Sequence, residues 1–142
     1  MIDWSFNFWA VLISTIITFF IGMLWYSDIL FGKIFRKSIG ITDKQASEAR
    51  KKGMGSMTKE LILTVIASMI FFMVLSIILN NIGATTIPLA IVVSIVLWLG
   101  FIVTKLLNNV LWEKRPIAIY WLGIFHELVS IIIGAIIIAL FL

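Results

Sequence analysis

The chain contains no cysteine, a single histidine and only two prolines among its 142 residues. Without cysteine it forms no disulfide and offers neither a thiol nucleophile nor a thiolate metal ligand. One histidine cannot build a zinc site by itself, and no carboxylate stands at a spacing that would complete one. These absences exclude thiol chemistry, and we expect neither a metal ion nor another cofactor.

Charged residues are also scarce, whereas apolar residues dominate. Only 13% of the residues are charged and 62% are hydrophobic, with a mean hydropathy of +1.16. Soluble domains are about 25% charged and about 45–50% apolar, and a soluble fold of this size could not hide so much apolar surface. A soluble enzyme, a nucleic-acid binder and a disordered chain are therefore disfavoured. The composition predicts a membrane protein with one domain and with lipids as partners.

Four apolar stretches are long enough to cross a bilayer, which takes roughly 20 residues per helix. They cover residues 6–26, 61–79, 87–107 and 117–141. Each is apolar on all sides, whereas the strands of a membrane β-barrel alternate between polar and apolar residues. The sequence predicts an all-α, polytopic membrane protein: a bundle of four transmembrane helices in a single domain over residues 1–142.

Turn-forming residues bound these stretches. Asn80, Asn81 and Gly83 follow the second stretch and are typical of a helix C-terminus. Pro88 and Pro116 stand at the starts of the third and fourth, where the missing amide hydrogen costs nothing. The N-terminus lacks the basic region of a signal peptide, so we expect the first stretch to remain as an anchor.

Lysine and arginine concentrate in two of the connections. Those in the first connection, at about residues 28–59, are Lys33, Arg36, Lys37, Lys44, Arg50, Lys51, Lys52 and Lys59. Lys114 and Arg115 lie in the third connection, and the second has no charged residue. Because cytoplasmic loops carry an excess of lysine and arginine, loops one and three are predicted to be cytoplasmic and both termini outside. We expect a multi-pass protein of the cell membrane, the inner membrane of a bacterium.

The first connection is predicted to hold helical structure of its own. Apolar and basic residues alternate over residues 31–37, which suits a short amphipathic segment at the lipid headgroups. The run Thr42–Gln45 has the pattern of a capping box and predicts a short polar helix that continues to about Lys52 and ends at Gly53. We interpret the basic charge of this connection as the ordinary excess of lysine and arginine on the cytoplasmic side of a membrane. The alternative is that it binds anionic lipid or the phosphate of a nucleotide.

Three ionisable residues fall inside the predicted spans, where a charge is costly and marks a candidate functional site. Lys105 either pairs with Glu127 on the next span or extends to the headgroups. Glu127 either makes that pair, is protonated, or faces a polar cavity, and His126 is a packing residue or a ligand-binding one. The candidate polar cluster, with its neighbours at helical spacing, is Lys105, Asn108, Asn109, His126, Glu127 and Ser130.

Small residues recur every four positions in the first span, at Ala10, Ser14, Thr18 and Gly22. Small side chains in this register let two helices approach closely. The stripe is a packing face, either within one subunit or between subunits of a homo-oligomer.

Three motifs carry a resemblance to a known family. They are Ile21–Lys33 (IGMLWYSDILFGK), Leu97–Phe101 (LWLGF) with Asn109 and Glu113–Pro116 after it, and His126–Ser130 (HELVS) followed by Gly134. The chain resembles the bacterial family called domain of unknown function 1761, whose members are small four-helix membrane proteins. The resemblance implies that Gly22, Trp25, Tyr26, Gly32, Asn109 and His126 are motif positions, without assigning them a role. Asp28 departs from the proline common at that place, and Lys105 is not typical of the family.

These observations leave two functional hypotheses. Adjacent residues on a helix diverge by about 100°, so His126 and Glu127 should not face one substrate together, and no catalytic residues are predicted. The favoured hypothesis is a non-catalytic module that packs as a homo-oligomer and binds lipid or a protein partner. The alternative is a minimal oligomeric transporter or channel for a small molecule or cation, with Glu127 as its carboxylate.

Overall fold

The computed structural model describes residues 1–142, except for the side chain of Met54. All regular elements in this part of the chain are helical. They are α1 (Phe8–Trp25), α2 (Gly32–Ser38), α3 (Asp43–Lys52), the 3-10 turn η1 (Met54–Met57), α4 (Thr58–Ile82), α5 (Ile87–Leu97), the π-helical segment η2 (Trp98–Val103), α6 (Thr104–Leu111) and α7 (Ile117–Leu140).

Four helical segments are long and apolar enough to cross a membrane: Phe8–Trp25, Gly55–Ile82, Ile87–Leu111 and Ile117–Leu140. The all-helical class and the four candidate spans predicted from the sequence are therefore confirmed. The second and third segments extend beyond the predicted stretches 61–79 and 87–107. Hydropathy marks only the apolar part of a helix, and residues such as Asn80 and Asn108 continue these helices without interrupting their hydrogen bonds.

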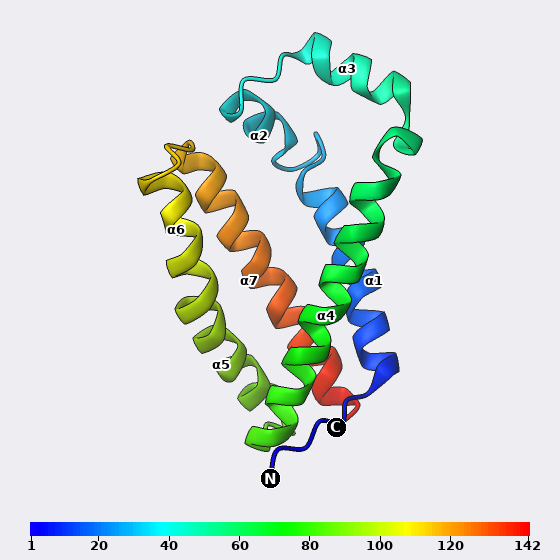
Figure 1. Cartoon of the computed structure of the whole chain (residues 1–142), viewed down its shortest axis with the longest axis vertical. Coiled ribbons are helices and arrows are strands. Elements are labelled where there is room, and N and C mark those ends of the chain that lie inside the picture. Colours follow the sequence, from blue (N-terminus) through cyan, green and yellow to red (C-terminus); the bar gives the residue numbers. More distant parts are fainter.

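Helix α7 lies at the centre of the molecule. It packs most extensively against α1 and α5 and also contacts α2, α4 and α6. Helix α4 packs mainly on α1 and makes few contacts with α5. As Figure 1 shows, α4 and the continuous α5–α6 rod come close at one end of the molecule and diverge toward the other. Both chain termini lie at the end where they meet, and the connections before α4 and α7 lie at the opposite end.

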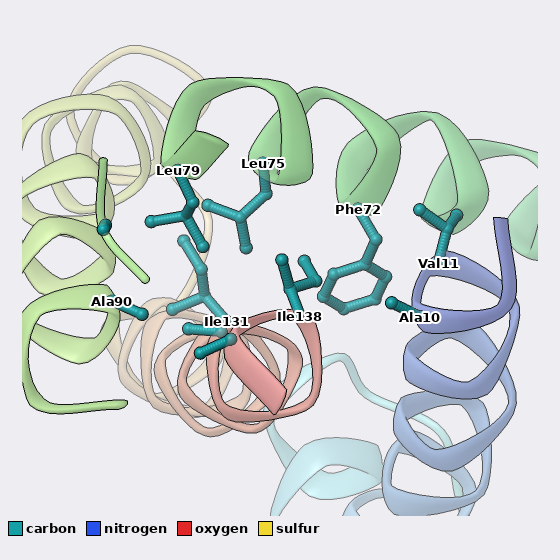
Figure 2. Close-up of a cluster of buried hydrophobic side chains, with 11 residues drawn as sticks. Ala10, Val11, Phe72, Leu75, Leu79, Ala90, Ile131 and Ile138 are labelled. Carbon is teal, nitrogen blue, oxygen red and sulfur yellow. The ribbon is translucent and has the colours of Figure 1, made fainter. Parts of the chain in front are cut away.

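The apolar core lies toward the end that holds the termini. Figure 2 shows side chains of α4 pointing at α7, with α1 and α5 on either side. The labelled core residues, each at most 3% exposed, are Ala10, Val11, Phe72, Leu75, Leu79, Ala90, Ile131 and Ile138. Ser14 and Thr18 of the small-residue stripe are buried as well. The stripe of α1 is therefore a packing face within one subunit.

The connection between α1 and α4 has the local structure that the sequence predicts. The Thr42 hydroxyl accepts the Gln45 amide N–H, and the Gln45 side chain accepts the Thr42 amide N–H, which completes the capping box. Helix α3 then continues to Lys52 and ends at Gly53, whose φ of 71° favours glycine. At the end of α4, Gly83 adopts the left-handed conformation in the same way.

The π-helical segment inside the third span has no counterpart in the sequence prediction. Two side-chain hydroxyls donate to backbone carbonyls of this segment. The Thr104 hydroxyl donates to the Gly100 carbonyl over 2.6 Å, and the Tyr120 hydroxyl of α7 donates to the Val103 carbonyl over 3.1 Å. The hydrogen bond from Tyr120 joins α7 directly to the α5–α6 rod.

A glycine in α7 sets how closely α4 approaches. A Cβ atom added at Gly134 would overlap the ring of Phe72, which is 2% exposed and cannot move into solvent. We expect Gly134→Ala to destabilise the fold by about 1–3 kcal/mol through overpacking, measured as a lower midpoint of thermal unfolding in a mild detergent.

The matched control lies on the same helix. A Cβ atom at Gly123 would meet Leu106 Cδ1 at 3.9 Å, an ordinary contact, so Gly123→Ala should leave the midpoint unchanged or slightly higher, because alanine favours helix. Equal midpoints for the two variants would contradict this account of the α4–α7 contact.

Candidate functional site

A half-open pocket of about 650 Å³ lies between α1, α4 and α7. Its walls are mostly apolar, and its polar groups come chiefly from α7 and the last turns of α1. The lining residues are Thr18, Phe19, Gly22, Met23, Tyr26, Met57, Leu61, Thr64, Ala67, Ser68, Phe71, Phe72, His126, Glu127 and Ser130. Pockets of about 300–1,000 Å³ with apolar walls and a few polar groups are typical of small-molecule sites.

Helix α7 contributes His126, Glu127 and Ser130 to this pocket. The His126 Nδ1 atom lies 3.5 Å from Glu127 Oε1, which is too long for a strong hydrogen bond. The side chains of His126 and Glu127 are 18% and 40% exposed. Both side chains line the pocket, although they diverge by about 100° around the helix.

The motif residues of α1 surround the histidine. A Cβ atom at Gly22 would lie 3.2 Å from His126 Nε2, so a side chain at this position would press on the imidazole. The ring centroids of Tyr26 and Trp25 lie 5.5 and 5.9 Å from that of His126. The His126 Nε2 atom is buried and has no hydrogen-bond partner among the described residues. Three motif positions of α1 therefore form the wall against which His126 packs.

Two tryptophan side chains fix the turn of α7 that precedes His126. The Trp25 indole N–H donates to the Leu122 carbonyl over 3.2 Å, and the Trp98 indole N–H donates to the Ile124 carbonyl over 2.7 Å. The sequence placed Trp25 and Trp98 in family motifs and predicted no contact for either. The available signal was chemical, because an indole N–H inside an apolar span needs an acceptor.

Gly32 sharpens the turn that leads out of α1. An added Cβ atom would lie 2.5 Å from the Tyr26 carbonyl oxygen and 2.7 Å from the Ser27 backbone. The Gly32 N–H donates to the Ser27 carbonyl over 2.8 Å, and the Phe31 N–H donates to the Trp25 carbonyl over 3.0 Å. Only glycine allows this approach of backbone to backbone, which brings α2 against α7.

The other members of the predicted polar cluster lie elsewhere. Lys105, Asn108 and Asn109 belong to α6, and none of them lines the pocket. Lys105 is exposed and forms no ion pair with Glu127, among the described residues. The backbone carbonyls of Asn108 and Asn109 accept the amide N–H groups of Trp112 and Arg115, which ends α6 and starts the connection to α7. The structure thus brings together His126, Glu127 and Ser130 only.

A cluster that the sequence reasoning missed lies next to the pocket. The Asp28 carboxylate forms ion pairs with Arg36 and Arg50. Arg36 Nη1 lies 2.5 Å from Oδ1, and Arg50 Nη2 lies 2.6 Å from Oδ2. The hydrogen bond from Arg36, followed by that from Arg50, lowers the pKa of the Asp28 carboxyl below its ordinary value of 3.8. One carboxylate therefore holds α2 and α3 to the end of α1.

The histidine and the carboxylates do not gather in a metal-binding arrangement. In the part of the chain that the structure describes, no group of three or more His, Asp or Glu residues is placed to hold an ion.

The fold and the pocket define a class of protein. It is a small helical protein with four segments able to span a membrane, and the polar side chains of His126, Glu127 and Ser130 line a pocket between α1, α4 and α7. The particular family follows from its sequence model. The model described as "Protein of unknown function (DUF1761)" matches residues 9–139, and the chain belongs to that family. Comparison with curated proteins gives no match, and neither does comparison with solved structures.

The Asp28 cluster gives a testable dependence on pH. A lowered pKa in the folded state means that the carboxylate stabilises the α2–α3 segment above pH 3.8 and loses this effect as the pH falls through the lowered value. We expect Asp28→Asn to raise amide hydrogen exchange over residues 32–52 by a few-fold at pH 7, with the difference from wild type shrinking below pH 3.8.

Glu48→Gln serves as the control, because Glu48 is an exposed residue of α3 without an ion pair among the described residues. Exchange in Asp28→Asn that matches wild type at pH 7 would show that Asp28 does not hold the segment.

Proposed function

We propose that this chain is a non-catalytic membrane module that binds an amphipathic molecule, in the first instance a membrane lipid, in the pocket between α1, α4 and α7. The observation that carries the proposal is the composition of that pocket. The apolar walls suit the alkyl or aromatic part of a ligand. The side chains of His126, Glu127 and Ser130 on α7 suit its polar group. A purely apolar ligand would leave these polar groups without partners.

The surroundings of His126 support a binding role. A buried polar atom without a partner is costly, and a ligand can supply that partner. The Nε2 atom of His126 has no hydrogen-bond partner among the described residues, and its Nδ1 atom is 3.5 Å from Glu127. The immediate surroundings of the imidazole are Gly22 and aromatic rings, which suit the recognition of a ligand.

The arrangement of the helices is consistent with assembly in the cell membrane. Outward-facing side chains of α4 and α5 are apolar, including Ile62, Ile70, Val92 and Val96, each at least 54% exposed. Such surface suits lipid tails or a second copy of the chain. We propose a homo-oligomer oriented with the connections before α4 and α7 in the cytoplasm and both termini outside, since those connections carry the lysines and arginines.

The transporter hypothesis uses the same pocket. Glu127 faces the half-open space and is not held by Lys105, so its carboxylate is available to a proton or a cation. A transporter must also release the ligand on the other side of the membrane. Measurable flux, in addition to binding, therefore distinguishes it from a binding module.

Filling the pocket tests the binding proposal. Ala67 lines the pocket on α4, so Ala67→Trp should place an indole where the ligand lies. Overpacking costs about 1–3 kcal/mol, which weakens binding of the ligand by about 5- to 150-fold. Native mass spectrometry of protein released gently from its own membrane measures the fraction that retains a bound lipid.

The control is Ile70→Trp, since Ile70 lies on the same helix, is 54% exposed and does not line the pocket. It should retain lipid as wild type does. Equal retention by Ala67→Trp and Ile70→Trp would refute ligand binding in this pocket.

The absence of native cysteine makes the orientation directly measurable. Ser47 on α3 and Thr85 between α4 and α5 are both exposed. In intact cells, a membrane-impermeant thiol reagent should label Thr85→Cys and leave Ser47→Cys unlabelled until the membrane is permeabilised. The reverse pattern would overturn the proposed orientation.

A further inference from the structure

The polar end of the pocket carries a carboxylate without a fixed cation opposite to it. Among the described lining residues there is no lysine and no arginine, and the titratable ones are Tyr26, His126 and Glu127. Helix α4 contributes only apolar residues and the hydroxyls of Thr64 and Ser68 to the lining. Among the described residues, the basic group next to Glu127 is the imidazole of His126, whose Nδ1 atom lies 3.5 Å from Glu127 Oε1.

A carboxylate in such surroundings needs a positive partner. A charge among apolar groups is costly unless it is paired, and the sequence offers Lys105 as the nearest candidate. The structure leaves Lys105 exposed on α6 and outside the pocket. The missing positive charge is therefore best supplied by a ligand.

The rest of the lining favours a cation that carries apolar groups. Phe19, Tyr26 and Phe71 line the pocket, and aromatic rings attract cations through their negative faces. Small divalent cations prefer sites with several carboxylate or carbonyl oxygens, whereas the described lining offers a single carboxylate beside side-chain hydroxyls. The volume of about 650 Å³ also exceeds what an ion needs.

We propose that the ligand of this pocket is an organic cation with apolar substituents, either a free lipophilic ammonium-type ion or the protonated amine headgroup of a lipid. Its charge lies at Glu127, and its apolar groups lie against α1 and α4. The proposal rests on the binding function proposed above and specifies the chemistry of the ligand. An anion of the same shape is rejected, because it meets the Glu127 carboxylate and no compensating cation in the described lining.

Two ions of similar shape and opposite charge test this inference. Tetraphenylphosphonium and tetraphenylborate are titrated into purified full-length protein in a neutral detergent, and binding is measured by isothermal calorimetry. Wild type should bind the cation and reject the borate. Glu127→Gln should weaken binding of the cation by about tenfold or more and weaken the discrimination between the two ions.

Two further variants separate the lost charge from a damaged fold. Glu127→Asp keeps the carboxylate and should retain cation binding within a few-fold. Glu113→Gln removes an exposed carboxylate in the α6–α7 connection, outside the pocket, and should bind as wild type does. Loss of binding in either variant to the level of Glu127→Gln would overturn the role of the Glu127 charge.

The outcomes also distinguish this inference from the proposed function. If both ions bind equally and Glu127→Gln changes neither affinity, the proposal of a cationic ligand is overturned. The pocket would then bind apolar molecules whatever their charge. If neither ion binds, the proposal of a cationic ligand is overturned as well. The lipid retention of Ala67→Trp then tests the proposed binding function separately. Under the proposal, displacement of the bound cation by phosphatidylethanolamine and not by phosphatidylglycerol assigns the natural source to an amine headgroup. Displacement by neither lipid assigns it to a free organic cation.

Discussion

The packing of α7 against its neighbours is the interaction on which the rest of the structure depends. This helix contacts α1, α2, α4, α5 and α6, so its position sets those of the others. Two indole N–H groups, from Trp25 and Trp98, donate to successive parts of its backbone just before His126. In apolar surroundings such donors have few alternatives, and they therefore fix both the depth and the rotation of α7 relative to α1 and the α5–α6 rod.

Close approach between helices is made possible by glycine at three places. Gly134 admits the Phe72 ring of α4, Gly22 admits the His126 imidazole, and Gly32 lets the chain fold back on Tyr26. The first contact closes the bundle near the termini. The other two position the histidine and the turn into α2. Because α4 and α7 diverge toward the other end (Figure 1), the packing that closes one half of the bundle leaves the pocket between α1, α4 and α7 in the other half.

The chemistry of this pocket follows from which charges the fold separates. Lys105 and Glu127 are oppositely charged groups of the third and fourth candidate spans, and among the described residues they do not pair with each other. Outside the spans, Asp28 is instead paired with two arginines. One carboxylate thus stabilises the connection, while the other is left facing a largely apolar space. This contrast is the physical basis for the structural role of Asp28 and for the binding role that we propose for Glu127.

The sequence by itself determined the features that depend on neighbouring residues. The lengths of the apolar stretches predicted four helices able to span a membrane, the Thr42–Gln45 pair predicted the start of α3, and Gly53 predicted its end. Only the tertiary structure decided the π turn at Trp98–Val103, the pairing of Asp28, and the contact of Trp25 with a carbonyl 97 positions away. Hydropathy and capping act over a few residues. Contacts between distant helices depend on their rotation and tilt, which the combined packing of all side chains sets and no single motif encodes.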